Sequence, residues 1–118
     1  MTNDKELRDL DAELAVKVMG WQDDVKRSGY YYEETLAGPP RAISCHEWQP
    51  TVDPAAAMEV LKKCAEKISP DEAVIEIAFS DGTWTVNHHF HYYIEGEAKT
   101  LETAIARFAR KLFGQEDK

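Results

Sequence analysis

Cysteine and long apolar runs are scarce in this sequence. Its 118 residues include two cysteines, Cys45 and Cys64, and no apolar run approaches the roughly 18 residues that would cross a membrane. No signal-peptide pattern precedes the first helical segment, which carries charges throughout. We therefore expect a cytoplasmic protein whose thiols stay reduced and pack as small buried hydrophobes. A disulfide between the two cysteines is the alternative.

Basic residues are also few. The chain has 14 Lys and Arg against 22 Asp and Glu, which gives a formal net charge of −8. Binding to nucleic acid in general needs a basic face that displaces counterions from phosphates, so we expect no such activity. Arg107, Arg110 and Lys111 do lie close together near the C-terminal end. We interpret them as the solvated end of a helix, where cations suit the helix dipole.

Catalytic motifs are missing as well. The sequence has no P-loop, no Gly-x-Gly-x-x-Gly, no Cys-x-x-Cys and no His-Glu-x-x-His. Cys45 and His46 are neighbours, and neighbouring residues on a strand point to opposite faces, so they cannot form a nucleophile–base pair. The sequence therefore predicts no catalytic residues and no cofactor, and it favours a protein that is not an enzyme.

Three segments have the apolar spacing of amphipathic helices: residues 3–19, residues 53–68 and residues 100–112. Gly20 offers a left-handed stop to the first, and Asp53-Pro54 supplies an N-cap and a favoured first residue to the second. Thr100 can cap the third. The apolar stripes, spaced by three or four residues, are Leu7, Leu10, Leu14 and Val18; Ala57, Val60, Leu61, Cys64 and Ile68; and Leu101, Ile105, Phe108 and Leu112.

The clearest local signal is a β-hairpin over residues 73–90. Asp81-Gly82 is a two-residue turn that needs positive φ at both positions, and it sets Phe79 opposite Trp84 and Ile77 opposite Val86. We expect the sheet face that carries these side chains to lie in the core. That face comprises Ile75, Ile77, Phe79, Trp84 and Val86, with His88 and Phe90 further along.

Weaker strand signals occur at residues 30–32 and 41–45. Residues 92–94 are expected to extend the second hairpin strand, and Glu95-Gly96-Glu97 is expected to be a loop. These elements together predict a single α+β domain over residues 1–118, with a core of about residues 4–114. Three amphipathic helices would pack on a small antiparallel sheet that contains the Asp81-Gly82 hairpin.

Three segments taken together resemble a known family. They are Leu10 to Trp21, which ends in Val-Met-Gly-Trp; Trp48 to Val60, which is rich in alanine; and the strand Trp84-Thr85-Val86, followed by Ala98 and by Glu102 to Ala106. In this order and spacing the chain is similar to the small phage and prophage proteins that carry the phage ABA sandwich domain. The resemblance covers about Leu7 to Phe113.

This resemblance implies a small sheet sandwiched by helices, in an α/β/α arrangement. It also implies a phage or prophage origin, and hence a location in the cytoplasm of a bacterial host. It implies no set of catalytic residues. The run Tyr30-Tyr31-Tyr32 and the stretch His88-His89-Phe90-His91 are not part of the family pattern.

Four residues are candidates for a ligand-binding role: Trp48, Arg41, His89 and His91. On a strand, His89 and His91 project to one face about 6–7 Å apart at Cα, where they could share a metal. A zinc site needs three or four ligands, so we expect packed or exposed histidines and no metal. Trp48 lies in a loop before a helix, where it could stack on a flat ligand or simply pack.

Tyrosines suggest a surface for partners. If Tyr30-Tyr31-Tyr32 and Tyr92-Tyr93 lie on strands, alternate rings would be exposed, as at many interaction surfaces. We therefore interpret the chain as a non-enzymatic phage accessory protein that binds a protein partner or a small molecule, with homo-oligomer formation as a further expectation.

One version of this function is a sequestering binder of nucleotide-type immune signals. It would use Trp48 with Arg41 and Lys26-Arg27, because such a ligand needs an aromatic ring to stack on and local cations. A small metal-dependent enzyme that uses His89 and His91 is an alternative. A structural or morphogenetic component of the virion is another.

Overall fold

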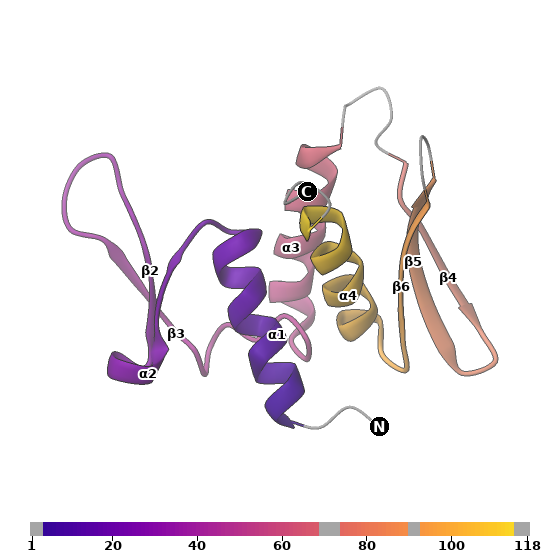
Figure 1. Ribbon diagram of the computed structural model, residues 1–118, viewed down its shortest axis with the longest axis horizontal. Coiled ribbons are helices and arrows are strands. Elements are labelled where there is room, and N and C mark those ends of the chain that lie inside the picture. Colours follow the sequence, from indigo (N-terminus) through magenta and orange to yellow (C-terminus); the bar gives the residue numbers. More distant parts are fainter. Residues whose placement is uncertain (1–3, 69–73, 90–92, 115–118) are drawn as a thin grey trace.

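Helices lie between two small sheets in the computed structural model, which describes residues 4–68, 74–89 and 93–114 (Figure 1). Three 14-residue helices form the middle layer: α1 (Asp4–Lys17), α3 (Pro54–Lys67) and α4 (Leu101–Gly114). The first sheet contains β1 (Gln22–Asp24), β2 (Tyr30–Glu33) and β3 (Arg41–Ser44). The second contains β4 (Glu76–Ser80), β5 (Thr83–His89) and β6 (Tyr93–Ala98).

The predicted α+β class is confirmed, and all strand pairs in both sheets are antiparallel. The arrangement of layers differs from the expectation. The strands divide into two sheets that flank the helices, whereas the sequence predicts one sheet with helices packed on it. A short fourth helix, α2 (Val25–Ser28), connects β1 to β2.

The ends of the helices follow the local signals in the sequence. Asp53 caps α3, and its Oδ1 accepts a hydrogen bond of 3.3 Å from the Ala55 backbone N–H. Gly20, with φ of 75°, follows α1 and reverses the chain in a conformation that glycine adopts without strain. The three predicted helices are therefore confirmed to within about two residues at each described end, which is the usual uncertainty of helix boundaries.

Strand β1 and helix α2 are absent from the sequence prediction. β1 consists of three polar residues, so it has no apolar alternation that would reveal it. It pairs with β2, with Asp23 opposite Tyr31. α2 has only four residues and ends at Gly29, whose φ is 83°. Both elements are too short for a periodic pattern.

The hairpin of β4 and β5 has the register that its turn dictates. Asp81 has φ of 53° and Gly82 has φ of 75°, as a two-residue hairpin turn requires. Ser80 pairs with Thr83, and Phe79 pairs with Trp84. The same register continues to Glu76, which pairs with Asn87.

Strand β6 corrects two expectations. Residues 95–97 are not a loop, because Gly96 pairs with Val86 in the middle of β6. Tyr93 does not extend β5 either, since it pairs back with His89 in the antiparallel direction. The glycine that reads as a turn signal serves instead to let β6 lie close to α4, where a side chain would collide with the helix backbone.

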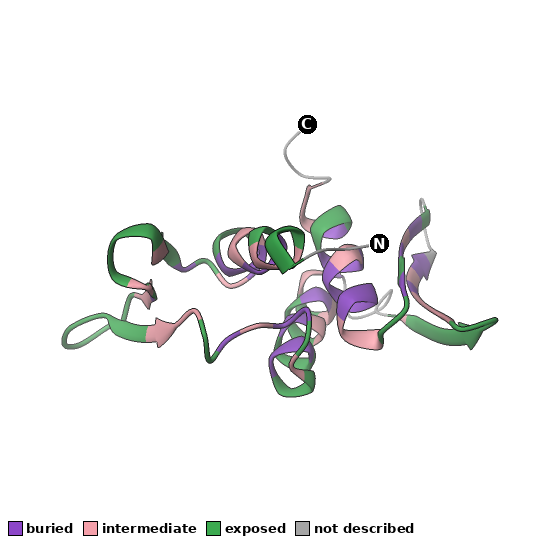
Figure 2. Cartoon of the chain, turned by 90° about the horizontal axis from the view of Figure 1, so that it is seen from below, coloured by how far each residue is buried: buried purple, intermediate pink, exposed green. Residues whose placement is uncertain are grey.

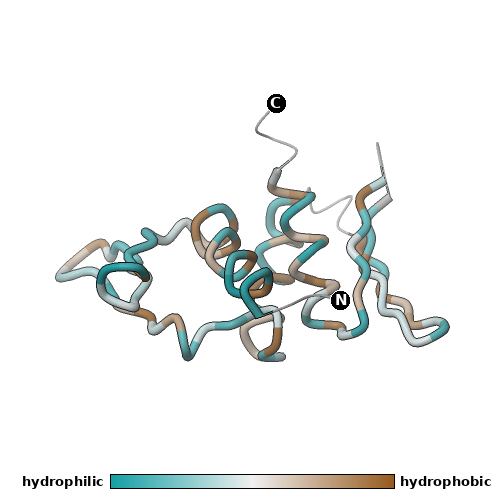
Figure 3. Tube along the Cα trace, turned by 60° about the horizontal axis from the view of Figure 1, so that its bottom comes forward, coloured by the Kyte–Doolittle hydropathy of each residue, from teal (hydrophilic) through white to brown (hydrophobic). Residues whose placement is uncertain are grey.

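The core lies around α4, which packs against α1, α3, β5 and β6. Apolar positions recur along all three long helices (Figure 3). Most of the three predicted stripes are buried, and only Leu7, Leu61 and Leu101 among their members are partly exposed. The largest fully buried side chains include Phe108, Leu14, Ile94, Ile105, Val60 and Val86.

The predicted core face of the hairpin is buried only in part. Val86 on β5 is fully buried, whereas Ile77 is 45% exposed and Phe79 is 57% exposed. The reason is that α4 covers β5 and β6, while β4 extends beyond the helix and is exposed along its whole length (Figure 2). The predicted pairs Phe79–Trp84 and Ile77–Val86 are confirmed, but β4 contributes the outer half of the face, which lies outside the core. Phe90 lies outside the described residues.

Candidate ligand-binding pocket

A buried polar network fixes the turn before α3 against α1. Asp11 is 1% exposed, and its Oδ1 accepts a hydrogen bond of 3.0 Å from the Thr51 backbone N–H. Arg8 Nη2 lies 2.9 Å from Asp11 Oδ2 and donates to Thr51 Oγ1 at 3.0 Å. Desolvation raises the pKa of Asp11, although the Thr51 N–H and the Arg8 charge act in the opposite direction. Asp11 is thus a structural carboxylate with specific partners.

The loop that contains Thr51 also binds the N-terminal end of α4. Thr103 Oγ1 donates to the Thr51 carbonyl at 2.9 Å, and Thr100 Oγ1 donates to Thr103 Oγ1 at 3.0 Å. Thr100 Oγ1 also accepts the Thr103 backbone N–H at 3.3 Å, so Thr100 caps α4. A continuous chain of hydrogen bonds therefore runs from α1 through the turn to the start of α4.

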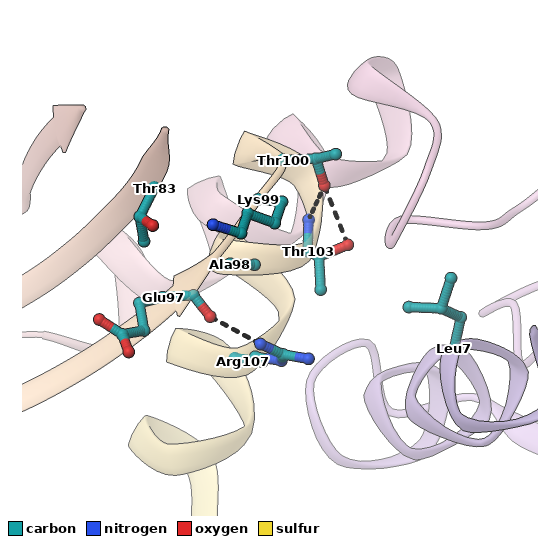
Figure 4. A pocket seen from close by; sticks show the side chains of 8 residues that line it. All are labelled: Leu7, Thr83, Glu97, Ala98, Lys99, Thr100, Thr103 and Arg107. Carbon is teal, nitrogen blue, oxygen red and sulfur yellow. Dashed lines mark hydrogen bonds between the residues drawn. The ribbon is translucent and has the colours of Figure 1, made fainter. Parts of the chain in front are cut away.

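A pocket of about 710 Å³ opens beside this helix start (Figure 4). Leu7 of α1 stands on one side of it and Thr83, at the start of β5, on the other. The volume lies within the range of roughly 300–1,000 Å³ that small-molecule sites occupy. Its lining residues are Leu7, Thr83, Glu97, Ala98, Lys99, Thr100, Thr103 and Arg107.

The lining combines charge, hydroxyl groups and apolar surface. Arg107 Nη1 donates to the Glu97 carbonyl at 2.8 Å, which holds the guanidinium at the rim. Lys99 is exposed in the connection between β6 and α4. The N-terminal end of α4 adds its positive partial charge. The hydroxyl protons of Thr100 and Thr103 are already donated within the network, and Glu97 adds one carboxylate to the lining. An anionic group would therefore be held by Lys99 and Arg107, with Leu7 and Ala98 as apolar contacts.

Comparison with protein families identifies the family of the chain. The model of the phage ABA sandwich domain matches residues 12–109. The chain belongs to the phage ABA sandwich domain family. All of the lining residues except Leu7 lie within the matched range. No curated protein and no solved structure matches the chain.

Trp48 does not line the pocket of this phage ABA sandwich protein. It is 4% exposed and packs edge-on against Trp21, with ring centroids 4.8 Å apart, and against Tyr31 at 6.0 Å. Its indole Nε1 has no hydrogen-bond partner in the described part of the chain. Trp48 therefore belongs to a buried aromatic cluster beside β2.

Arg41 lies near that cluster but is already paired. Its Nε donates to Glu33 Oε1 at 2.7 Å, and Glu33 Oε2 accepts a hydrogen bond of 3.3 Å from Trp21 Nε1. The hydrogen bond from Arg41 lowers the pKa of Glu33. The structure thus connects Arg41 to the aromatic cluster through Glu33. The ligand-binding role of Arg41 and Trp48 stays a prediction.

Of the two histidine candidates, His89 lies in the other sheet, beyond the helices. His91 is outside the described residues, and His89 is placed only as the last residue of β5. Their ligand-binding role also stays a prediction. Their neighbour His88 is buried, and its Nδ1 lies 3.0 Å from the Val74 carbonyl. Over the ranges described, no three His, Cys, Asp or Glu side chains gather as a metal site would require.

Lys26 and Arg27 line a smaller hollow of about 290 Å³ together with Asp23 and Asp24. Arg27 Nε lies 3.9 Å from Asp24 Oδ2, so the acidic residues partly balance the two cations.

Both cysteines are free thiols, Cys64 buried and Cys45 half-buried. No described helix is long and apolar enough to cross a membrane.

Sequence reasoning missed the pocket because its walls come from separated parts of the chain. Thr100 was identified as a helix cap and Arg107 as part of a basic helix end, and both assignments describe local structure. Among the other lining residues, only Thr103 has a place that the sequence suggests, because it follows the cap residue Thr100 by three positions. Nothing in the spacing of Leu7, Thr83 and Lys99 indicates that they meet.

Proposed function

We propose that this phage ABA sandwich protein binds a small anionic molecule in the pocket beside α4, without catalysing a reaction on it. The observation that carries this proposal is the pocket itself, whose volume of about 710 Å³ is lined by two cationic residues, one carboxylate residue and three threonines. A few charged groups on a concave, partly apolar surface are the usual features of a small-molecule site.

The fixed geometry of the walls supports binding. Thr103 is tied to Thr51, and Thr51 to the buried Asp11, so one wall is anchored in the core. Arg107 is held by the Glu97 carbonyl. A site whose groups are positioned before the ligand arrives loses less conformational entropy on binding, which favours affinity.

A sequestering binder of nucleotide-type signals is the particular version that the pocket volume favours. A nucleotide supplies the anionic group for Lys99 and Arg107, and an uncharged part that Leu7 and Ala98 can contact. The lining contains no aromatic ring, so stacking on Trp48 is not part of this version. Because the chain carries a net charge of −8, the attraction for an anion must come from these local cations.

The remaining expectations have less support. The metal-dependent enzyme depends on His89 and His91, and His91 lies outside the described residues, so no observation favours it. A location in the cytoplasm of the bacterial host and assembly into a homo-oligomer are compatible with a soluble binding protein, and they belong to the same proposal. A virion component has no supporting feature in the described residues.

Thermal denaturation with a panel of ligands tests the proposal. The panel contains cyclic nucleotides, cyclic and linear ADP-ribose compounds, and the uncharged nucleosides that match them. We expect at least one anionic member to raise the Tm by more than about 2 °C, because a ligand that binds only the folded state stabilises it. The matched nucleosides should give a smaller shift or none.

Two substitutions locate the binding site. Lys99→Gln and Arg107→Gln should each weaken the ligand-induced shift, because they remove one cation from the pocket lining. Lys62→Gln is the matched control, since Lys62 is an exposed lysine on α3 that is not among the lining residues. The proposal fails if no ligand shifts the Tm, or if Lys99→Gln and Arg107→Gln both respond as the unmodified protein does.

A further inference from the structure

The two edge strands of the β4–β5–β6 sheet differ in how far their outward backbone groups are already bound. β6 forms one edge, and α4 supplies two cations to its outward carbonyls. Arg107 Nη1 donates to Glu97 O at 2.8 Å, and Lys111 Nζ donates to Glu95 O at 2.7 Å. β4 forms the other edge, and all five of its residues are exposed (Figure 2).

The hairpin register shows which groups β4 presents to solvent. In a two-residue hairpin the residues that flank the turn bond to each other, so Ser80, Ala78 and Glu76 direct their backbone groups toward β5. The same alternation places the carbonyls of Glu95 and Glu97 at the outer edge of β6, where Lys111 and Arg107 bind them. The outward groups of β4 therefore belong to Ile77 and Phe79.

The side chains of Ile77 and Phe79 form an apolar shelf next to this edge. Both lie on the helix-facing side of the sheet, in register with Val86 and Trp84, but beyond the cover of α4. The Phe79 and Trp84 rings are 4.9 Å apart between centroids. β4 carries no lysine and no proline, which are residues that usually prevent edge strands from pairing with other chains.

We propose that β4 is a dimer interface, at which β4 of a second copy of the chain pairs in the antiparallel direction about a two-fold axis at Ala78. This register pairs all five residues of β4. Ile77 meets Phe79 of the partner subunit, and their outward backbone groups bond to each other. The two sheets become continuous, and the two apolar shelves meet on the same face.

Charge is compatible with this register. Glu76 lies opposite Ser80 of the partner subunit, whose hydroxyl can donate to the carboxylate, so no two carboxylates face each other directly. Each copy nevertheless carries a net charge of −8, and two such chains repel at long range. The interface is also small, so we infer a weak dimer that becomes tighter as salt screens the repulsion.

Sedimentation velocity across a concentration series tests this proposal. We expect a monomer–dimer equilibrium that shifts toward the dimer at high salt, whereas association with a basic contaminant would weaken with salt. Ile77→Lys should abolish the dimer. Val52→Lys is the matched control, because Val52 is a similarly exposed apolar residue (50% against 45%) outside β4, and both changes add the same charge. Ile77→Thr, which suits a strand, should also weaken the dimer if Ile77→Lys does not fold.

Disulfide trapping tests the register itself, in a Cys45→Ser background. Ala78→Cys should form an intermolecular disulfide on mild oxidation, because directly opposite Cβ atoms are about 4.5–5.5 Å apart. Thr85→Cys is the control, because Thr85 lies on β5, opposite Ala78. In the dimer the two copies of Thr85 are separated by three strand spacings of about 4.8 Å each, so this variant should not cross-link. A monomer at all concentrations and salts, a dimer that survives Ile77→Lys and Ile77→Thr, or equal cross-linking of the two cysteine variants would overturn the proposal.

Discussion

Gly96 on β6 lies directly against the backbone of Phe108 on α4. A Cβ atom built on Gly96 would stand 2.2 Å from Phe108 N and 2.4 Å from Ala104 O. Both are backbone atoms within a helix, so neither can move aside by a change of rotamer. The absence of a side chain at this position therefore sets the distance between α4 and the sheet.

Gly96→Ala should be strongly destabilising. The added methyl group must push β6 away from α4, and this separates the two elements that contain Ile94, Ile105 and Phe108, all almost fully buried. We expect a loss of about 3 kcal/mol or more in the free energy of unfolding, at the upper end for overpacking, or failure to fold. Chemical denaturation followed by circular dichroism measures this.

Gly114→Ala is the control for that experiment. Gly114 is the last residue of α4, and a Cβ built on it meets nothing within 4 Å. Because alanine favours a helix more than glycine does, this variant should be unchanged or more stable by up to about 1 kcal/mol. A Gly96→Ala protein as stable as Gly114→Ala would contradict the close approach of β6 and α4.

The contact at Gly96 also shows where prediction from the sequence reached its limit. The helices could be predicted because apolar spacing and caps such as Asp53 are local features. Glu95-Gly96-Glu97 has the composition of a loop, and only the packing of α4 makes a glycine necessary inside a strand there. Likewise, alternation predicted the shared face of Ile77 and Val86, but the extent of α4 decides which of them is buried.

The candidate site was less accessible to prediction than the fold. Trp48, the least explained aromatic in the sequence, lies in the core because Trp21 and Tyr31 meet it from other segments. The pocket depends on Leu7, Thr83 and Arg107, which are far apart along the chain. Spacing reveals sites built within one element, whereas this one forms where several elements meet.

Asp11→Ala should destabilise the protein by about 2–4 kcal/mol at neutral pH. The substitution leaves the buried Thr51 N–H without its acceptor, and it leaves the partly exposed Arg8 without its counter-ion. Asp11→Asn keeps an acceptor for Thr51 and should cost less. Equal losses for the two variants would show that the hydrogen bond to Thr51 contributes little.

The free energy of unfolding should depend on pH differently in the unmodified protein and in Asp11→Asn. Burial raises the pKa of Asp11 in the folded state above its unfolded value of about 4, so folding favours the protonated form. The stability from this group is fully present below pH 4 and declines as the pH rises through the folded pKa. The difference in unfolding free energy between the two proteins should therefore shrink as the pH rises from about 4, and a difference that grows would refute this sign.

Only one of the two thiols should react in the folded protein. Burial raises the pKa of Cys64 to about 12, so at pH 8 it is protonated as well as inaccessible, whereas Cys45 is half-buried. Titration with a chromogenic disulfide should find one fast thiol per chain in buffer and two in denaturant. Cys45→Ser should remove the fast thiol and Cys64→Ser should retain it; a fast Cys64 would mean that α3 opens readily.

Trp21→Phe should cost more stability than Trp48→Phe, although the two rings pack against each other 4.8 Å apart. The indole Nε1 of Trp21 donates to Glu33, and this hydrogen bond is lost with the substitution. Trp48 Nε1 is buried with no partner among the described residues, so replacing this indole with phenyl also removes an unsatisfied donor, which offsets part of the packing loss. We expect a difference of about 1 kcal/mol in denaturant unfolding, the usual net value of one hydrogen bond.

Adding Glu33→Gln to each variant gives the control, because this change should cost less in the Trp21→Phe background. A larger loss for Trp48→Phe would contradict this, because it would mean that the Trp48 indole has a hydrogen-bond partner.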